Sequence, residues 1–566
     1  MGFYTTVETT LKSCRELMTE VFFGREKIFS AKVIVLHAAL ILISFAFVYV
    51  FSYSTSFRYD FLGGDSSIFQ SVGKYWAQGY LPYVDLFEHK GALLFLFNAL
   101  GYVIYPRAGI MVPQTIFLYV SCLFVWRAME LYLSSAWKIF FMLLTLIYYA
   151  AHYQEGNHPT EYSVLFLSAA AYCFLRALKA SEGKKFFHPP LYGFIYGFGF
   201  GACFLIRLSD AAQICCQTFL AAIFLLQARD FRNLRQNVLS FCAGFAIILL
   251  PFVIYFAAHG ALYEFFFGTI LFNLKYTALP LQPFPPITLA IYYGVHFMPF
   301  WILIAASLLK ISSDRRSRLA WSGLFCDAAI LFMLTNFRLF RHYCMIFLPL
   351  TPLFFAVLVE LMPVVKAWFF REKIFLRKFV HSVLISLIAL YLILCQKIYV
   401  EPFDLYLTTE GVAEIQKQDL AGNMILRPQK FTAPYDFSDD KNFSSVKDLA
   451  KMIPVAERNS VVTWGYYCTT PHWVLETNIK PRERLFFLNA TFGKIDPAFR
   501  EEWFGNVRAN PPLWILYGVT CEKNSDGELN IFDSDDELEQ LLAEKYSLKG
   551  ETFIFPQVMK LYRLKE

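Results

Sequence analysis

Over its first 400 residues the chain alternates long apolar runs with short polar connections. Val33 to Tyr53 is an almost uninterrupted apolar run of about twenty residues, the length that a helix needs to cross a bilayer. Further runs of similar character cover 110–126, 137–151, 162–178, 191–208, 211–227, 238–258, 287–309, 319–335, 343–362 and 379–399. The pattern predicts a polytopic α-helical membrane protein with about eleven transmembrane helices.

The character of the chain changes at Glu401, where the hydrophobic runs shorten to the length of strands. Such runs cover 460–464, 513–517, 553–555 and 558–564, and a helical stretch covers 535–544. We therefore expect a separate soluble α/β domain at the C-terminus. The predicted division is a segment 1–32, a membrane domain 33–400 with a long first loop 54–109, and a domain 401–566.

The distribution of Lys and Arg among the loops predicts the orientation in the membrane. Positive clusters lie within 176–185, 229–235, 310–318 and 366–378, on alternate connections, as expected for cytosolic loops. This parity places 1–32 in the cytosol. It places 54–109, 152–161, 207–210, 259–286, 336–342 and everything after 399 outside, which is an N-in, C-out topology.

Composition narrows the class of protein. The chain is 57% hydrophobic and 17% charged, which excludes an ordinary water-soluble enzyme. Its 62 Phe and 33 Tyr lie mostly in apolar runs without interleaved basic residues, so they indicate lipid-facing surface rather than binding of nucleic acid. Most of the 12 Cys also lie in apolar segments. Only Cys468 and Cys521 lie in the polar C-terminal part, and sequence leaves open whether they form a disulfide.

Three local patterns carry structural predictions. Ser67 followed by Gln70 is a capping-box pattern, which predicts a short helix through Gln78 that Gly79 ends. The apolar stretch 90–106 begins with charge and predicts an interfacial or re-entrant helix. A four-residue spacing of small residues predicts a face for close helix packing at Gly193, Gly197 and Gly201.

Polar and ionisable residues gather on the predicted outer face. They are Asp65, Asp85, Glu88, His89, Lys90, Glu155, His158, Glu161, Arg207, Asp210, Lys275, Arg338, Arg341 and His342. Arg338 and Arg341 lie on the side where basic residues are disfavoured, which indicates an anionic ligand. Guanidinium groups and a lysine suit a phosphate, and at a bilayer surface that phosphate would belong to a lipid. Neighbouring carboxylates would supply a base.

Several of these motifs resemble a known family. They are Gly64-Asp65-Ser-Ser-Ile-Phe, Gly79-Tyr-Leu-Pro-Tyr-Val-Asp85-Leu-Phe-Glu88-His89-Lys90-Gly91, Glu155-Gly-Asn-His-Pro-Thr-Glu161, Leu205-Ile-Arg207 and Arg338-Leu-Phe-Arg341-His342-Tyr343. The pattern resembles bacterial membrane glycosyltransferases of the GT-C class. It looks most like glycosyltransferase family 39, the branch related to protein mannosyltransferases and the lipid A aminoarabinose transferase. The resemblance covers most of the membrane part and is weaker in the C-terminal domain.

The resemblance implies an activity. Such enzymes transfer a sugar from a polyprenyl-phosphate donor to a hydroxyl of a glycan, lipid or protein at the outer face of the bacterial cytoplasmic membrane. They need no nucleotide sugar, and the sequence requires no cofactor and leaves a divalent cation undetermined. The family's acidic catalytic residue after the first span matches Asp65. Ser66 stands where a second acid is common, so the division of roles among Asp65, Asp85 and Glu88 stays open.

The remaining residues are assigned to donor-phosphate and substrate binding. They are His89, Lys90, Glu161, Arg207, Arg338, Arg341 and His342, and Lys90 matches the Lys of the family's acidic-Lys-Pro motif although Gly91 replaces the proline. Simpler interpretations remain. Asp65 could be a carboxylate favoured by a helix N-terminus, and Arg207 with Asp210 could be a structural ion pair.

Two further questions stay open at this point. Glu155, His158 and Glu161 lack the strict spacing of a helical metal motif, so no metal ligands are assigned. The main alternative function is a non-enzymatic transporter of a sugar or lipid-linked phosphate. Against it, the charges gather at one face and no internal repeat is visible. A scaffold or receptor leaves the charges unexplained.

Overall fold

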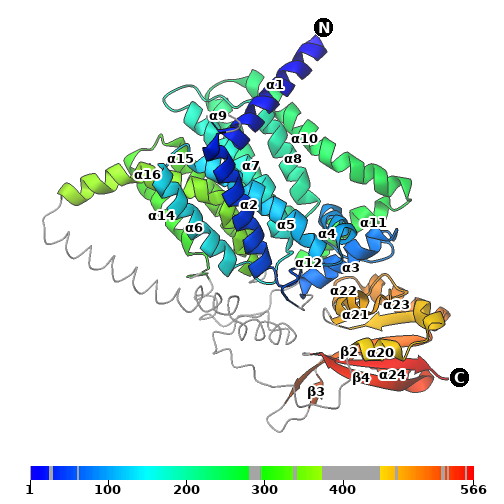
Figure 1. Cartoon of the computed structure of the whole chain (residues 1–566). Coiled ribbons are helices and arrows are strands. Elements are labelled where there is room, and N and C mark those ends of the chain that lie inside the picture. The colour runs from blue at the N-terminus through cyan, green and yellow to red at the C-terminus, as the bar shows by residue number, and fades with distance from the viewer. Residues whose placement is uncertain are drawn as a thin grey trace. The chain divides into compact units, whose positions relative to one another are not determined.

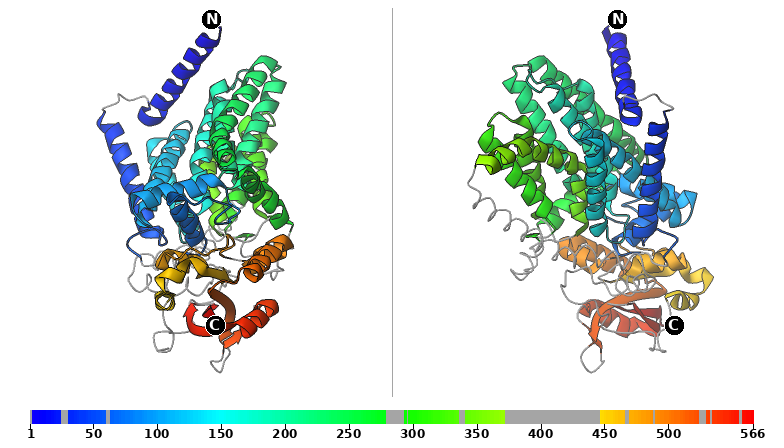
Figure 2. Two further views of the ribbon diagram at one scale, coloured as in Figure 1. Left: turned by 90° about the vertical axis from the view of Figure 1, so that its right-hand side faces the viewer. Right: turned by 60° about the vertical axis from the view of Figure 1, so that its left-hand side comes forward.

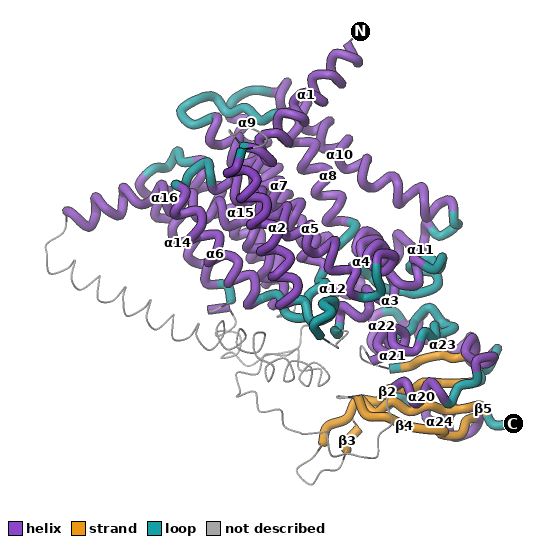
Figure 3. Tube along the Cα trace, in the orientation of Figure 1, coloured by secondary structure: helices purple, strands orange, loops and turns teal. Residues whose placement is uncertain are grey.

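The computed structural model describes residues 2–24, 30–59, 63–278, 293–294, 296–335, 341–371, 446–465, 469–487, 489–523, 529–531, 534–554 and 557–566. Most of these residues are helical, and the strands lie in the C-terminal part (Figure 3). Backbone contacts divide the chain into two compact units. One contains Met1–Ser52, Met111–Tyr255 and Leu281–Asp404, and the other contains Tyr53–Ile110, Phe256–Pro280 and Leu405–Glu566. The first loop therefore groups with the C-terminal part.

The first unit is a set of helices (Figure 1). They are α1 (Gly2–Phe23), α2 (Ala31–Phe51), α5 (Met111–Met129), α6 (Ser135–Ala151), α7 (Pro159–Ala180), α8 (Pro190–Phe204), α9 (Ala212–Gln227), α10 (Phe231–Ala258), α14 (Met298–Ser313), α15 (Arg318–Thr335) and α16 (Phe347–Arg371). The last residues of α10 belong to the second unit. Helix α5 packs against α2 and α7, and α14 packs against α15 and α16. Many of these helices run alongside one another in both views of Figure 2.

Six helical stretches in the described residues are long and apolar enough to cross a membrane. They are Ala31–Phe51, Ala108–Met129, Pro159–Ala180, Leu208–Gln227, Phe231–Ala258 and Arg341–Val365. The prediction of a helical membrane protein is confirmed at this level. The expected span 379–399 lies outside the described residues, as do 287–292 and 295 of the expected span 287–309. The number eleven and the orientation therefore stay predictions.

Helix α8 shows the close packing that its glycines predict. A Cβ atom on Gly193 would lie 2.7 Å from the backbone oxygen of Asn237 on α10, and one on Gly197 would overlap the backbone of Phe241. Gly244 of α10 faces α8 in the same way, at the backbone of Phe194. The small residues therefore let the two backbones approach where side chains would keep them apart.

In the second unit, the residues from the first loop form α3 (Asp65–Ala77) and α4 (Ala92–Ile104), which pack against each other. Helix α4 has 13 residues, too few to span a bilayer as a straight helix. The predicted capping box is wrong, because the N-cap of α3 is Gly64, three residues before the expected Ser67. Ser67 Oγ donates to the Gly64 carbonyl, and the Gln70 amide donates to Ser66 Oγ and the Ser54 carbonyl. Gly79, with φ +93°, follows the helix as predicted.

The C-terminal part carries a sheet with the strand order β1-β2-β5-β4, and β3 pairs with β2. The strands are β1 (Val461–Trp464), β2 (Trp514–Lys523), β3 (Leu529–Ile531), β4 (Tyr546–Ile554) and β5 (Gln557–Leu564). Strand β1 is parallel to β2, and the other pairs are antiparallel. Each strand run expected from the sequence falls on one of these strands. Cys468 lies outside the described residues, so its pairing with Cys521 stays open.

Short helices alternate with these strands along the chain. They are α20 (Val446–Lys451), α21 (Thr469–Thr477), α22 (Asn489–Ile495), α23 (Pro497–Ala509) and α24 (Asp536–Lys545). Trp464 of β1 packs against Trp503 and Phe504 of α23, and Leu538 of α24 joins the same buried core. The segment 256–280 adds α11 (Leu262–Phe266) and α12 (Phe272–Thr277), separated by a π-helical turn over 267–271.

Candidate functional site

Three consecutive side chains of the first loop form a charged cluster in the second unit. Glu88 Oε1 lies 3.2 Å from His89 Nδ1 and 3.9 Å from Lys90 Nζ. Lys90 Nζ lies 2.6 Å from His89 Nε2. Glu88 and His89 are buried, whereas the Lys90 side chain keeps 22% of its surface exposed. The cluster therefore presents one cation to its surroundings and holds a carboxylate behind it.

The carboxyl group of Glu88 has an unusual proton affinity. Burial raises its pKa from 4.5 to about 7, Lys90 opposes the rise, and Asp65 adds to it. Two backbone N–H groups, those of Lys90 and His89, also favour the ionised form. A carboxyl group with a pKa near 7 can exchange a proton at neutral pH, which is the property of a general acid or base.

Tyr83 fixes the backbone of this loop. Its φ of +70° is rare for a residue with a side chain, and the tyrosine is fully buried. The Tyr83 hydroxyl donates to the Lys90 carbonyl at 2.8 Å. Its ring lies against Gly268, where a Cβ atom would approach Tyr83 Cδ1 to 2.5 Å. A strained residue held this firmly is typical of a loop whose shape serves a site.

Aromatic packing holds the other side of the loop. The Phe87 ring lies 5.2 Å from Phe272 and 4.6 Å from Phe499, measured between centroids. The Phe87 N–H donates to the Arg484 carbonyl at 2.9 Å, and Asn273 Nδ2 donates to the His89 carbonyl at 2.7 Å. The charged cluster is thus fixed by segments far away in the sequence.

The other two predicted catalytic acids have different surroundings. Asp65 is the first residue of α3, where the helix dipole favours a negative charge. It is close enough to Glu88 to raise the pKa of that group. Asp85 Oδ2 accepts a hydrogen bond from the Leu81 N–H at 2.6 Å and closes the turn that precedes the cluster. The structure thus brings Asp65 near Glu88 and gives Asp85 a structural role.

In the first unit, Glu161 is the centre of a buried hydrogen-bond network. Its Oε2 accepts from Tyr153 Oη at 2.5 Å and from Gln114 Nε2 at 2.9 Å, and its Oε1 accepts from the His158 N–H at 2.7 Å. Gln114 also donates to Ser52 Oγ at 3.1 Å. These partners hold the start of α7 to α5 and the end of α2, so Glu161 has a positioning role within this unit.

Arg207 lies beside the same region of the first unit. Its Nε donates to Asp210 Oδ1 at 2.7 Å, and its Nη2 donates to Thr160 Oγ1 at 2.7 Å. The guanidinium carbon lies 4.0 Å from the centroid of the Tyr343 ring. The expected ion pair with Asp210 is therefore present. Arg207, Asp210 and Tyr343 also line a small pocket whose apolar wall includes Ile330 and Leu334.

Two histidines complete this polar region. His342 Nδ1 lies 2.7 Å from Gln154 Oε1, and its ring stacks on His158 with centroids 4.0 Å apart. Burial lowers the pKa of His158 to about 3, and the charge of Arg207 lowers it further. Arg341 begins the 3₁₀ turn η4 (Arg341–Ile346), directly before His342. Neutral imidazoles can act as hydrogen-bond donors, acceptors or metal ligands.

The predicted site residues therefore fall into two described groups. Asp65, Asp85, Glu88, His89 and Lys90 belong to the second unit, and Glu161, Arg207, Arg341 and His342 belong to the first. Arg338 lies outside the described residues.

Sequence reasoning missed the residues that hold these groups. Tyr83, Asn273 and Phe499 fix the loop, and Gln114 and Tyr153 hold Glu161. The polar Gln114 inside an apolar run was a usable signal, because such residues usually need an internal partner. Tyr83, Phe499 and Tyr153 could not be distinguished in the sequence from the many other Phe and Tyr residues of the chain.

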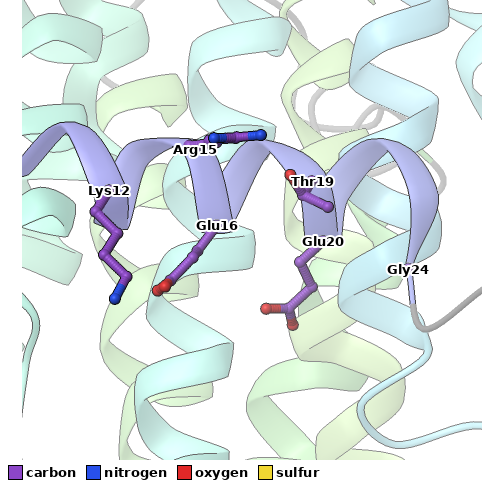
Figure 4. Close-up of a pocket in the computed structure, with 6 residues that line it drawn as sticks. All are labelled: Lys12, Arg15, Glu16, Thr19, Glu20 and Gly24. Atoms are coloured by element: carbon purple, nitrogen blue, oxygen red, sulfur yellow. The ribbon is translucent and has the colours of Figure 1, made fainter. Parts of the chain in front are cut away.

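A larger hollow of about 690 Å³ lies beside α1 (Figure 4). Lys12, Glu16 and Glu20 project from the same side of the helix there. Glu20 is already engaged, because Arg176 forms an ion pair with it and Tyr172 Oη donates to it at 3.1 Å. The hollow carries charges of both signs, Lys12 and Arg15 followed by Glu16 and Glu20. It therefore lacks the concentrated charge that marks the other two groups.

Comparison with known proteins adds no identification: no protein-family model matches the chain, and no curated protein matches it.

Proposed function

We propose that the protein is a membrane glycosyltransferase that moves a sugar from a polyprenyl-phosphate donor to an acceptor hydroxyl at the outer face of the bacterial cytoplasmic membrane. The observation that carries the proposal is the Glu88–His89–Lys90 cluster beside Asp65. It combines a carboxyl group that titrates near pH 7 with a partly exposed cation. The topology of about eleven spans, with the N-terminus inside and the C-terminal domain outside, belongs to the same proposal.

In this mechanism Glu88 accepts the proton of the acceptor hydroxyl. The acceptor oxygen then bonds to the anomeric carbon of the sugar, and the bond from that carbon to the phosphate oxygen breaks with its electron pair on the phosphate. Lys90 stabilises the charge on the leaving phosphate. This refines the sequence-based hypothesis, which matched the family's acidic catalytic residue to Asp65 and left the division of roles among Asp65, Asp85 and Glu88 open. Asp65 increases the proton affinity of Glu88 instead, a division of roles between two carboxylates set by their surroundings.

The first unit supplies a second proposed role, recognition of the lipid phosphate. Arg207 and Arg341 are the candidate contacts, with Arg338 and His342 as further substrate-binding residues, and Glu161 positions the start of α7 beside them. Asp210, Thr160 and the Tyr343 ring hold the Arg207 guanidinium in one orientation. A guanidinium held this way supports charge-assisted binding of a phosphate, because its orientation is already fixed and little side-chain entropy is then lost on binding.

The test is transfer of radiolabelled sugar by the purified full chain, with a panel of polyprenyl-phosphate hexose and pentose donors and membrane glycolipid acceptors. Glu88→Gln and Lys90→Ala should each reduce the transfer rate about 100-fold or more. Lys451→Ala is the control, because Lys451 is 76% exposed and pairs only with Asp448 in its own helix among the interactions described. Normal transfer by both site variants would refute the assignment.

A second candidate function, transport of a sugar or lipid-linked phosphate, is favoured by Asp327. This residue lies in α15, is fully buried, and neither carboxylate oxygen has a hydrogen-bond partner among the described residues. Ionisable groups inside a membrane protein often mark a transport pathway. Flux of a labelled substrate into proteoliposomes that Asp327→Asn abolishes, without any sugar transfer, would favour this candidate over the enzyme.

A further inference from the structure

Asp327 lies in the interior of the first unit without a partner for its charge. The residue belongs to α15 and is fully buried, and neither carboxylate oxygen has a hydrogen-bond partner among the described residues. Glu161 of the same unit, by contrast, accepts hydrogen bonds from Tyr153, Gln114 and the backbone of His158. Burying an uncompensated carboxylate costs several kcal/mol, so Asp327 needs either a proton or a cation.

Three other buried side chains of this unit also have an unpaired oxygen atom. They are Gln213 and Gln217 of α9 and Ser307 of α14, and each is no more than 1% exposed. Gln213 Oε1, Gln217 Oε1 and Ser307 Oγ have no hydrogen-bond partner among the residues that the structure describes. Buried polar atoms are rarely left this way, which points to a ligand.

Helix geometry places Ser307 on the side toward which the Asp327 side chain leans. Gly323 is one helical turn before Asp327, so the two residues share a face of α15. Side chains on a helix lean toward its N-terminus, so the carboxylate leans over Gly323, which has no side chain to fill the space. A Cβ atom on Gly323 would lie 2.6 Å from Ser307 Oγ, so the hydroxyl borders that space.

Two contacts set the register of α9 against α15. The thiols of Cys216 and Cys326 share a hydrogen bond. Ala212, one turn earlier on α9, lines a small pocket together with Ile330 and Leu334, which come later on α15. The two helices are therefore antiparallel.

This register brings the glutamines to the side of Asp327. Gln217 and Asp327 directly follow the two cysteines, and residues that follow a contact pair on antiparallel right-handed helices turn to the same side of the contact. Gln213 is one turn before Gln217 and shares its face. Its Nε2 donates to the Leu167 carbonyl at 3.3 Å, and its Oε1 is the unpaired atom.

From these observations we infer that the first unit binds one Na⁺ ion between α9, α14 and α15, with the ligands Asp327, Gln213, Gln217 and Ser307. All four side chains offer oxygen atoms, the ligands that hard cations prefer. A single carboxylate balances a monovalent ion, whereas a divalent ion would leave excess positive charge in an apolar interior. The inference does not rest on the proposed glycosyltransferase activity.

Binding is an exchange of one cation for another. Without Na⁺ the buried Asp327 carboxyl keeps its proton, because a bare carboxylate is too costly there. When Na⁺ enters, the carboxyl group gives up this proton to the solvent and the charge of the site stays the same. Ion binding should therefore reduce the infrared absorption of the protonated Asp327 carboxyl.

The test measures saturable binding of radioactive Na⁺ to the purified full chain in detergent, after dialysis into a choline buffer. We expect one ion per chain. Asp327→Asn should abolish this binding and the infrared change, and Gln217→Leu should weaken the binding at least tenfold. Asp314→Asn is the control, because the Asp314 side chain is 49% exposed and lies near Lys310. Its affinity for Na⁺ should equal that of the unmodified chain.

Folding of each variant is checked by size-exclusion chromatography, and Ser307→Ala, which removes one oxygen ligand, replaces Gln217→Leu if that variant fails. A carboxyl group that holds only a proton would give no saturable Na⁺ binding to the unmodified chain, and this result would overturn the inference. Unchanged Na⁺ affinity in folded Asp327→Asn would overturn it as well.

Discussion

Replacing Glu88 by Gln tests the charged loop most directly, because Gln keeps the shape of the side chain and cannot titrate. Burial raises the pKa of Glu88 from 4.5 to about 7, and the side chain is 2% exposed. A rise of this size corresponds to about 3 kcal/mol less favourable ionisation in the folded protein than in the unfolded chain.

The sign of the pH effect follows from this rise. The folded protein binds the Glu88 proton more tightly than the unfolded chain, so protonation of Glu88 favours folding. This contribution to the stability is present in full below pH 4.5. It is lost as the pH rises through about 7. Between pH 5 and pH 8 the unmodified chain should therefore lose up to about 3 kcal/mol of stability relative to Glu88→Gln.

The assay is thermal unfolding in detergent from pH 5 to pH 8.5, for the unmodified chain, Glu88→Gln and Glu182→Gln. Glu182 is the control, because its side chain is 62% exposed. Glu88→Gln should show a flatter dependence of the unfolding temperature on pH, and Glu182→Gln should follow the unmodified chain. If Glu88→Gln gave the same pH dependence as the unmodified chain, the raised pKa would be refuted. In the transfer assay, the rate should rise with pH through about 7.

Three further outcomes follow from the packing. Gly197→Ala should lower the stability by about 1–3 kcal/mol, because its Cβ atom would overlap Phe241. Gly505→Ala in α23 should raise the stability slightly, because space is open at that position. Thermal unfolding compares the two variants. Lys74→Met should lower the free energy of unfolding by about 1–3 kcal/mol, because the buried amine donates to the Val474 carbonyl and Asn478 Oδ1. Lys451→Met, at an exposed lysine, is the control, and an equal loss in the two variants would contradict this expectation. Phe87→Ala should cost about 3–5 kcal/mol and the 62% exposed Phe57→Ala much less; equal denaturation midpoints would exclude a core role for the Phe87 cluster.

The sequence alone predicted the helical membrane part, the strands near the C-terminus and the glycine face of α8. These features depend on local periodicity and on side-chain size, which are present in any short window of the chain. The polar residues of the first loop were also visible, because charges are costly in an apolar chain and therefore conspicuous. The capping box failed, because Ser67 and Gln70 found partners other than each other once the helix began at Asp65.

Only the tertiary structure decided which of these polar residues act on one another. The pKa of Glu88 depends on its burial and on Asp65, twenty-three positions away in the sequence, so the motif itself could not reveal it. The His158–His342 pair brings together residues separated by 184 positions, and its unsatisfied ring appears only when burial and hydrogen bonds are known. The sequence sets which side chains are available. Their proton affinity and ligand geometry arise from desolvation and from contacts between distant segments, which have no signature in local spacing.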